Sequence, residues 1–365
     1  MSDPQQKERT VLVAMSGGVD SSVALLLLRK QGLSAAGATM KLWDFSEVGG
    51  DRHRDGRCCG LESIHDARAV CDGLKAPHYV FDFTREFRET VIENFVSEYR
   101  AGRTPNPCIV CNSRIKWETF LRRALEIGCD AVATGHYART GYDEASGRYF
   151  LKRGIDGSRD QSYALWGISQ EALSRTFLPL GELTKVETRR IAAAAGIKTA
   201  QAPESMEICF VADDDYERFI REWTGAVISH GDIVDEAGRV IGRHRGIPFY
   251  TIGQRRGLGI THPTPLYVKM IDAAKNRLVV TEKAGLGRRT MTVTNVNWVS
   301  VSPTDAPFIA DVKIRYQHTA QPATVVPRGA DFLDVVFDTP QPAITPGQSA
   351  VFYTGDTVLA GGIID

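Results

Sequence analysis

The sequence predicts an α/β protein in which an N-terminal parallel-sheet domain is followed by a small mixed domain and a β-rich C-terminal domain. Over about the first two hundred residues, short apolar β-rich runs alternate with stretches of helical spacing, the pattern of a parallel sheet covered by helices. After about Asp215 the pattern changes to Gly-punctuated β runs, which are typical of a small barrel or sandwich. At roughly 150 residues per domain, 365 residues agree with two or three domains.

The expected strands of the N-terminal domain are short apolar runs at 11–15, 35–42, 78–83 and 131–134. Helical spacing predicts helices at 21–31, 62–74, 85–102, 113–128, 184–195 and 216–223. Further β runs are expected at 233–240, at 267–280 and from 288 onward. We therefore place the domains at 1–214, 215–282 and 283–365.

Composition excludes several classes of protein. With 44 basic and 44 acidic residues the chain is no polycation, so any nucleic acid must be held by a local basic surface. No apolar run approaches the roughly 20 residues of a membrane span, and the polar start lacks the apolar core of a signal peptide. We expect a cytoplasmic protein without a membrane partner. Seven cysteines are too few and odd in number for a disulfide scaffold, which favours catalysis or metal binding.

A glycine-rich loop, S-G-G-V-D-S at 16–21, joins the first expected strand to the first expected helix. Glycines at a strand exit let backbone N–H groups approach an anion, and the helix N-terminus adds its positive dipole end. The loop lacks the Walker and dinucleotide-binding patterns. A glycine turn with Asp20 or Ser21 as helix cap is the alternative. The complete string favours phosphate binding.

Cysteines occur in two further segments of interest. Cys108 and Cys111 form a C-x-x-C in a proline-bounded loop just before the helix expected at 113–128, where a helix N-terminus would lower the pKa of the Cys111 thiol. Half a zinc site and a thioredoxin-like redox pair are alternatives, although a second ligand pair at suitable spacing is missing. Cys209, flanked by Ile208 and Phe210, is by itself more typical of a buried core residue.

The phosphate loop resembles the pyrophosphate-binding loop of the ATP pyrophosphatase superfamily, whose members activate a carbonyl oxygen by adenylation. Six motifs occur in order: A-M-S-G-G-V-D-S (14–21), G-R-T-P-N-P-x-x-x-C-N (102–112), A-T-G-H-Y-A (133–138), R-D-Q-S-Y (159–163), S-M-E-I-C-F (205–210) and Y-T-I-G-Q-R-R-G-L-G (250–259). In order and spacing they resemble the tRNA-specific 2-thiouridylase family over nearly the whole chain. This resemblance implies an adenine nucleotide α-hydrolase-like domain, a central tRNA-contacting domain and a C-terminal β-barrel.

That family replaces the 2-oxygen of the wobble uridine of tRNA with sulfur and converts ATP to AMP and pyrophosphate. By resemblance, Cys209 carries the sulfur as a persulfide, and Cys111 liberates it and leaves a Cys111–Cys209 disulfide. The implied nucleotide contacts are Ala14, Met15, Ser16, Gly17, Gly18, Val19, Asp20, Ser21, Met40 and Gly135. The implied contacts with the target base and tRNA are Asn106, Pro107, Cys108, Arg159, Asp160, Gln161, Arg315 and Tyr316.

The resemblance also implies partners and one departure. Magnesium is expected with ATP, with Asp20 as a possible ligand, and the sulfur donor is a cysteine desulfurase or a sulfur-relay protein. Cys108 stands where family members often have an acidic residue, so either its thiolate handles a proton or that role is minor. His136 receives no catalytic role. No family role is carried over to four cysteines, which are interpreted as buried or incidental thiols: Cys58, Cys59, Cys71 and Cys129.

A basic run supports binding of nucleic acid. From Ala237 to Ile271 there is no acidic residue, and this predicts a surface for backbone phosphates, with a solvated face as the alternative. The basic residues of the run are Arg239, Arg243, Arg245, Arg255, Arg256 and Lys269.

Three alternatives remain open from the sequence, of which the first concerns only the source of sulfur. Cys108, Cys111 and Cys209 could hold an iron–sulfur cluster that delivers sulfide for the same reaction. Another ATP pyrophosphatase with a nitrogen nucleophile would have no use for Cys111 and Cys209 together. A sulfur carrier or RNA-binding protein without turnover would release no pyrophosphate.

Overall fold

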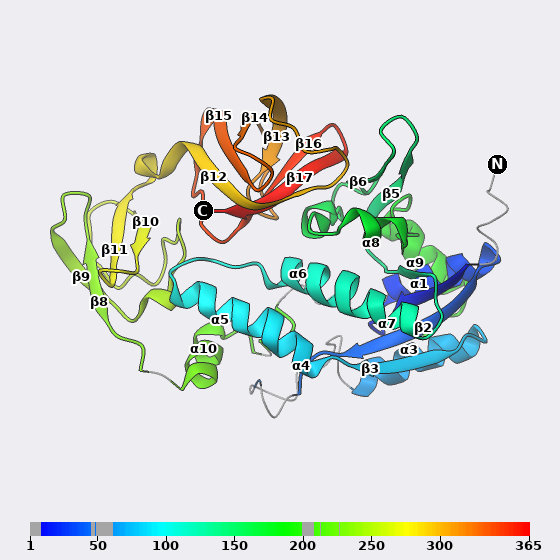
Figure 1. Ribbon diagram of the computed structural model, residues 1–365. Coiled ribbons are helices and arrows are strands. Elements are labelled where there is room, and N and C mark those ends of the chain that lie inside the picture. The colour runs from blue at the N-terminus through cyan, green and yellow to red at the C-terminus, as the bar shows by residue number, and fades with distance from the viewer. Residues whose placement is uncertain (1–8, 45–47, 49–60, 199–207, 212, 226) are drawn as a thin grey trace.

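The structure is a computed structural model, and it describes residues 9–44, 48, 61–198, 208–211, 213–225 and 227–365. Figure 1 shows the α/β domain at the lower right, the central domain at the left and the C-terminal barrel above both. Cys58, Cys59 and the first half of the S-M-E-I-C-F motif lie outside the described residues.

A parallel sheet forms the core of the N-terminal domain, in the order β3-β2-β1-β4-β7. Its strands are β1 (Thr10–Ala14), β2 (Ser34–Lys41), β3 (His78–Asp82), β4 (Ala131–Ala133) and β7 (Thr176–Phe177). Alternate residues of β1 enter separate clusters: Val11 and Val13 pack on one face of the sheet, and Leu12 packs on the other. Since both faces of the central strand β1 are covered, its residues 11–14 are all apolar and buried, whereas the edge strand β3 exposes Tyr79 and Val80. The four predicted strands are confirmed.

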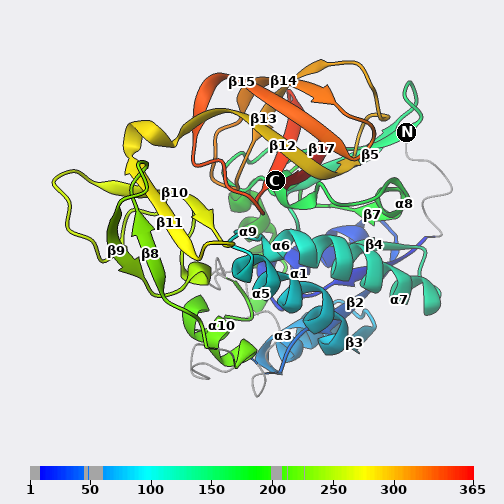
Figure 2. The same ribbon diagram turned by 60° about the vertical axis from the view of Figure 1, so that its left-hand side comes forward.

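Helices cover the two faces of this sheet (Figure 2). One face carries α1 (Val19–Lys30) and α3 (Leu61–Gly73). The other carries two continuous helical rods, built from α4 (Thr84–Phe87), η2 (Arg88–Ile92) and α5 (Glu93–Arg100), and from α6 (Pro107–Val110), η3 (Cys111–Phe120) and α7 (Leu121–Glu126). Farther along the chain lie η4 (Ser162–Leu165), α8 (Gln170–Ser174) and α9 (Lys185–Ala194).

The second rod begins earlier than the sequence analysis predicts. It starts at Pro107 instead of residue 113, so Cys108 and Cys111 lie in helix and not in a loop. Asn106 is the N-cap, with its side-chain oxygen accepting from the Ile109 N–H at 3.4 Å, and Pro107 occupies the first helical position. Both are helix-start signals, which the prediction interpreted as loop stiffness.

The central domain follows α10 (Tyr216–Thr224) and contains a four-stranded mixed sheet in the order β10-β11-β8-β9. Its elements are β8 (Gly231–Val234), β9 (Val240–His244), η6 (Ile247–Phe249), β10 (Leu266–Asp272), β11 (Arg277–Glu282) and η7 (Lys283–Leu286). The C-terminal strands are β12 (Gly287–Trp298), β13 (Phe308–Lys313), β14 (Gln321–Pro327), β15 (Phe332–Pro342), β16 (Ser349–Thr354) and β17 (Thr357–Ile364). Because β12 also pairs with β17, these strands close into the predicted barrel.

A hairpin of the N-terminal segment was not predicted. Strands β5 (Ala138–Asp143) and β6 (Arg148–Arg153) pair with each other, and β6 extends the sheet of the C-terminal barrel through Lys152 and Thr357. The Arg139 guanidinium reinforces this junction by donating to Asp356 at 2.9 Å. The hairpin is half polar and pairs with a strand far along the chain, so local hydrophobicity gave little sign of it.

Among the residues that the structure describes, no helix has both the length and the apolar character needed to cross a bilayer.

We expect the stability of the central domain to decrease as the pH falls below about 6.5. His244 is fully buried, its Nε2 lies 3.1 Å from the Asn276 carbonyl, and its Nδ1 accepts from the Gly246 N–H at 3.1 Å. Burial lowers the pKa of His244 below 6.5, so in that range the unfolded chain binds a proton that the native protein does not. Because a single proton is involved, the slope is at most about 1.4 kcal/mol per pH unit.

Thermal unfolding of the wild type and of His244→Gln between pH 5 and pH 8 tests this prediction. The melting temperature of the variant should depend less on pH. Equal slopes for both proteins would show that His244 titrates normally in the native state.

Candidate active site

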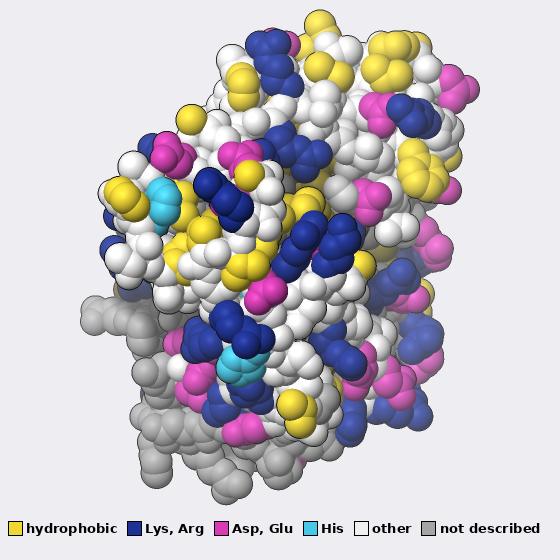
Figure 3. All heavy atoms as spheres, turned by 90° about the vertical axis from the view of Figure 1, so that its left-hand side faces the viewer, with side chains coloured by type: hydrophobic (Ala, Val, Ile, Leu, Met, Phe, Trp, Pro, Cys, Tyr) yellow, Lys and Arg dark blue, Asp and Glu magenta, His cyan; other side chains and the backbone are white. Residues whose placement is uncertain are grey.

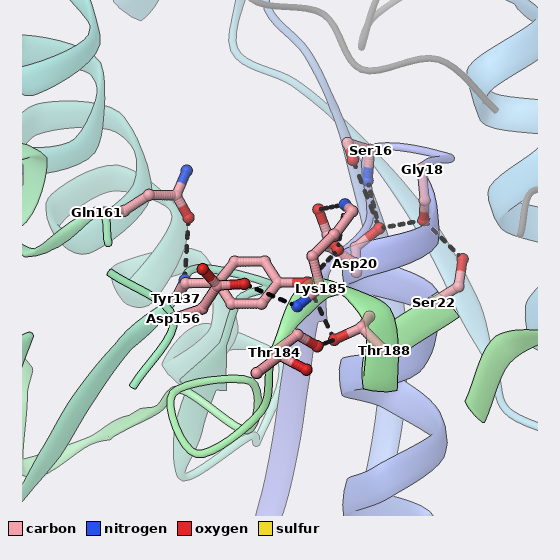
Figure 4. Close-up of polar contacts among 11 residues, drawn as sticks. Ser16, Gly18, Asp20, Ser22, Tyr137, Asp156, Gln161, Thr184, Lys185 and Thr188 are labelled. Atoms are coloured by element: carbon pink, nitrogen blue, oxygen red, sulfur yellow. Dashed lines mark hydrogen bonds and ion pairs between the residues drawn. The ribbon is translucent and has the colours of Figure 1, made fainter. Parts of the chain in front are cut away.

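The phosphate loop lies where β1 gives way to α1. Gly17 has φ +75°, and a Cβ there would come 2.7 Å from the Ser63 carbonyl oxygen of α3, so only glycine fits. The loop is closed by its own hydroxyl groups, as Figure 4 shows: the Ser16 N–H donates to Ser21 Oγ at 3.2 Å, and Ser22 Oγ donates to the Gly18 carbonyl at 2.8 Å.

The N-terminus of α1 has no side-chain cap. Gly18 is the N-cap residue, so the alternative that Asp20 or Ser21 caps this helix is wrong. Ser21 Oγ instead bridges Ser16 and Gly18 across the loop. The N–H groups of the first turn are thereby left without a capping side chain, which is the arrangement that binds phosphate at a helix N-terminus.

Two further predicted nucleotide contacts lie at the same edge of the sheet. Gly135, just beyond β4, approaches α1 so closely that a Cβ would come 2.7 Å from the backbone carbon of Asp20 and 2.8 Å from the Ser21 nitrogen. Met40 lies near the carboxyl end of β2, next to β1. In parallel sheets this edge is where ligands bind.

His136, which follows Gly135, is held in its neutral form. Its Nδ1 lies 2.7 Å from Thr134 Oγ1, and its Nε2 lies 3.4 Å from Lys116 Nζ. Burial, and secondarily the Lys116 charge, lower the pKa of His136 well below its ordinary value. Its imidazole is therefore uncharged near neutral pH.

The cysteines differ sharply in environment. Cys108 is exposed, whereas Cys111 and Cys209 are half-buried against the same hydrophobic cluster. Next to Cys209, the ring of Phe210 is fixed edge-on against Phe95, with ring centroids 5.2 Å apart.

Cys71 and Cys129 are buried, as interpreted from the sequence. Burial, with the neighbouring Asp72 charge, raises the pKa of the Cys71 thiol to about 11, and burial with Asp130 raises that of Cys129. These two thiols are accordingly poor nucleophiles.

The segment that leads into the predicted base contacts is clamped by both later domains. The Thr104 N–H donates to the Pro346 carbonyl at 2.9 Å, and Gln348 Nε2 donates to the Thr104 carbonyl at 2.8 Å. Thr104 Oγ1 lies 3.3 Å from Thr251 Oγ1 of the central domain. Beside it, Arg103 donates to the Ile364 carbonyl at 3.0 Å. Sequence reasoning missed this clamp because its partners are distant in the chain.

Within the predicted tRNA contacts, Asp160 differs from expectation. Its carboxylate is buried and accepts from the backbone N–H groups of Gly154 at 3.2 Å and Ser162 at 3.0 Å, so it stabilises its own turn instead of facing outward. Its neighbours Arg159 and Gln161 are half-buried.

On the barrel, Tyr316 is exposed and Arg315 is half-buried. Lys313, not identified from the sequence, places its ammonium 5.5 Å from the Tyr316 ring and 5.6 Å from the Tyr163 ring. Burial lowers the pKa of Lys313. Its position in the sequence, two residues before Arg315, was the available signal.

Most basic residues of the run at 237–271 have acidic partners. This corrects the prediction that the charge of the whole run is available to backbone phosphates. Acidic residues outside the run pair with four of its members, in the pairs Arg239–Asp235, Arg243–Asp232, Arg245–Glu217 and Lys269–Glu236. Figure 3 shows basic and acidic side chains interspersed on this face. Within the described part of the chain, Arg255 and Arg256 have no ion pair and keep their charge available.

Among the described residues, no group of three or more His, Cys, Asp or Glu side chains is placed to hold a metal ion, and this includes Cys108, Cys111 and Cys209. Asp20, the possible magnesium ligand, already accepts hydrogen bonds on both carboxylate oxygens, from Lys185 and Tyr137. A magnesium ion that enters with ATP would thus be held mainly by phosphate oxygens and water.

The parallel sheet and its uncapped, glycine-lined loop define an α/β nucleotide-binding protein. Family models agree: residues 9–213 match the tRNA methyl transferase HUP domain, 217–282 the tRNA methyl transferase PRC-barrel domain, and 288–364 the aminomethyltransferase beta-barrel domain.

Full-length relatives give the family. The tRNA-specific 2-thiouridylase MnmA of Geotalea uraniireducens is 47% identical over 98% of this chain and 96% of its own. Those of Amoebophilus asiaticus (48% identity, 98% of this chain and 96% of that one) and Clostridioides difficile (44% identity, 98% of both chains) are similarly close. The chain belongs to the tRNA-specific 2-thiouridylase family and is an enzyme, as the motifs indicated.

We expect Gly135→Ala to weaken ATP binding by at least about tenfold, since the added methyl group displaces the first turn of α1. Gly157→Ala is the matched control, because a Cβ there meets nothing within 4 Å. Equilibrium titration with ATP and magnesium measures the effect. Equal ATP affinities of the two variants would show that the close approach of Gly135 to α1 does not contribute to nucleotide binding.

Proposed function

We propose that this chain catalyses ATP-dependent 2-thiolation of the wobble uridine of tRNA, giving 2-thiouridine, AMP and pyrophosphate. The observation that carries the proposal is the uncapped phosphate loop, fixed against Gly135, in a chain that is 47% identical over nearly its full length to a named thiouridylase. We place the reaction in the cytoplasm, where tRNA is modified.

Adenylation is the first step of the proposed reaction. The first turn of α1 and the loop at 16–18 bind the ATP phosphates, and Met40 and Gly135 contact the nucleotide at the same sheet edge. The uracil 2-oxygen attacks the α-phosphorus, and pyrophosphate leaves. The oxygen then departs as AMP, which is a far better leaving group than the oxygen of an amide carbonyl. Magnesium bound to the phosphates would neutralise charge during this transfer.

Sulfur transfer is the second step. A cysteine desulfurase or sulfur-relay protein converts the Cys209 thiol to a persulfide. The Cys111 thiolate attacks Cys209 Sγ, forms the Cys111–Cys209 disulfide and releases hydrosulfide. Hydrosulfide attacks C2 of the adenylated uridine and expels AMP. Two electrons from a thiol reductant restore both thiols.

The tRNA is proposed to lie across all three domains, with boundaries at 1–214, 215–282 and 283–365. Asn106, Pro107 and Cys108 receive the target base, which must leave its stack before its 2-oxygen can react. The clamp on Thr104 fixes the position of this segment. Contacts with the tRNA backbone are assigned to the turn at 159–161 and to Arg315 and Tyr316 on the barrel. Within that turn, the buried Asp160 carboxylate accepts a backbone hydrogen bond and stabilises the turn.

Nucleoside mass spectrometry tests the activity. Unmodified tRNA is incubated with ATP, a sulfur donor and the protein purified either in air or anaerobically with iron. We expect 2-thiouridine with air-purified wild type, none with Cys209→Ser or Cys111→Ser, and wild-type yield with the control Cys129→Ser, because Cys129 is a buried thiol of raised pKa.

Each other outcome contradicts part of the proposal. Product only from iron-loaded protein would replace the persulfide with a cluster. Full activity of Cys209→Ser would show that Cys209 does not carry the sulfur, and no product under any condition would favour a pyrophosphatase with a nitrogen nucleophile. Failure to release pyrophosphate with ATP and tRNA would indicate a binding protein without turnover.

Cys108 is expected to be dispensable for sulfur transfer. It is exposed and has no step in the persulfide route, so Cys108→Ser should keep at least about a third of the wild-type kcat, a loss of under 1 kcal/mol. Single-turnover rates at several pH values measure this. A loss comparable to that of Cys111→Ser, restored by Cys108→Asp, would show that this position handles a proton.

A further inference from the structure

Asp20 in the first turn of α1 is held by side chains from two distant segments. Lys185 Nζ, from the first position of α9, lies 2.8 Å from both carboxylate oxygens of Asp20. The Tyr137 hydroxyl donates to Asp20 Oδ1, also at 2.8 Å (Figure 4). Lys185 and Tyr137 are only 7% and 3% exposed.

We propose that Lys185 and Tyr137 are positioning residues for ATP, which act through Asp20 to fix the phosphate loop. Asp20 is then the anchor of the loop and not a magnesium ligand. This inference rests on the proposed ATP-dependent function. It gives a role to Lys185, which lies outside the six motifs, and to Tyr137, which lies in one of them but received no role from the resemblance.

Burial and charge support this assignment. An ammonium group withdrawn from water is costly unless a counter-charge compensates for it, and here Asp20 is that counter-charge. A magnesium ion on the same carboxylate would lie beside the Lys185 ammonium, and like charges at such distances repel strongly in a partly buried site. Lys185 therefore competes with a metal at Asp20.

Lys185 is itself fixed in place. Thr184 and Glu187 form a capping box at the start of α9, in which the Thr184 N–H donates to Glu187 at 2.8 Å. The Lys185 N–H donates to Asp156 at 2.9 Å. The ammonium thus reaches Asp20 from a helix N-terminus with little freedom to move, as a positioning residue requires.

Tyr137 connects the same anchor to the rest of the site. Its hydroxyl lies 3.0 Å from Thr188 Oγ1, and its N–H donates to Gln161 Oε1 at 2.9 Å. It follows Gly135 and His136, and Gly135 packs on the backbone of Asp20. Displacement of Asp20 would therefore shift the first turn of α1 against Gly135, where the phosphates are proposed to bind.

The test measures the affinity for ATP with magnesium, by equilibrium titration of the full chain without tRNA. Lys185→Met should weaken binding about tenfold or more and Tyr137→Phe about threefold, since each removes a contact to Asp20. Lys30→Met is the matched control, because Lys30 is exposed at the far end of α1, and it should bind as wild type.

A double-mutant cycle separates an anchor from a metal ligand. If Asp20 and Lys185 act as one unit, Asp20→Asn combined with Lys185→Met loses no more affinity than the worse single variant, and the free magnesium concentration for half-maximal binding stays unchanged throughout. Losses that multiply, or a magnesium requirement raised only by Asp20→Asn, would overturn the proposal.

Melting temperatures distinguish residues that position ATP from a Lys185–Asp20 pair that only stabilises the fold. A folded Lys185→Met protein that melts lower than wild type but binds ATP equally well would overturn the proposal, and Tyr137→Phe provides the same test if Lys185→Met does not fold. The thiolation assay is independent. A wild-type protein that binds ATP but makes no 2-thiouridine would refute the proposed function and leave this inference standing.

Discussion

The constraint on which the proposed nucleotide site depends is the close contact between the backbone of Gly135 and the first turn of α1. It joins the end of β4 to the start of the helix after β1, and these two strands are neighbours in the sheet. On the other side of the loop, Gly17 packs on the backbone of Ser63 in α3. The phosphate loop is thus fixed on two sides by main chain, and the N–H groups of the first turn of α1 have no capping side chain.

The second organising feature is the clamp on Thr104. The central domain contacts it through Thr251, and the barrel contacts it through Pro346 and Gln348. The segment proposed to receive the base therefore depends on the two domains proposed to hold tRNA. This arrangement explains physically why a nucleotide-binding domain is joined to two β domains in one chain: each contributes to the position of a segment that none of them fixes alone.

Much of the fold could be predicted from the sequence because its information is local. Apolar strands buried on both faces, helical spacing and glycine punctuation identified the sheet, the helices and the barrel. Some errors concern long-range partners: the β5–β6 hairpin finds its neighbour only in β17, and the ion pair of Arg245 joins it to Glu217. Others are local, since the cap at Asn106 and the Arg239–Asp235 pair lie within a few residues and were still missed. Lys185 is the clearest example, because no feature of the neighbouring sequence predicts that this lysine forms an ion pair with Asp20.

The β5–β6 hairpin has a consequence for the order of events during synthesis. It belongs to the first half of the chain, yet β6 pairs through Lys152 with Thr357 of β17, which is synthesised much later. Until β17 arrives, the outer edge of β6 presents unpaired backbone groups, which is a known template for mispairing. The parallel sheet of the nucleotide-binding domain needs no strand from the barrel, but the hairpin beside it gains its neighbour only when β17 is in place.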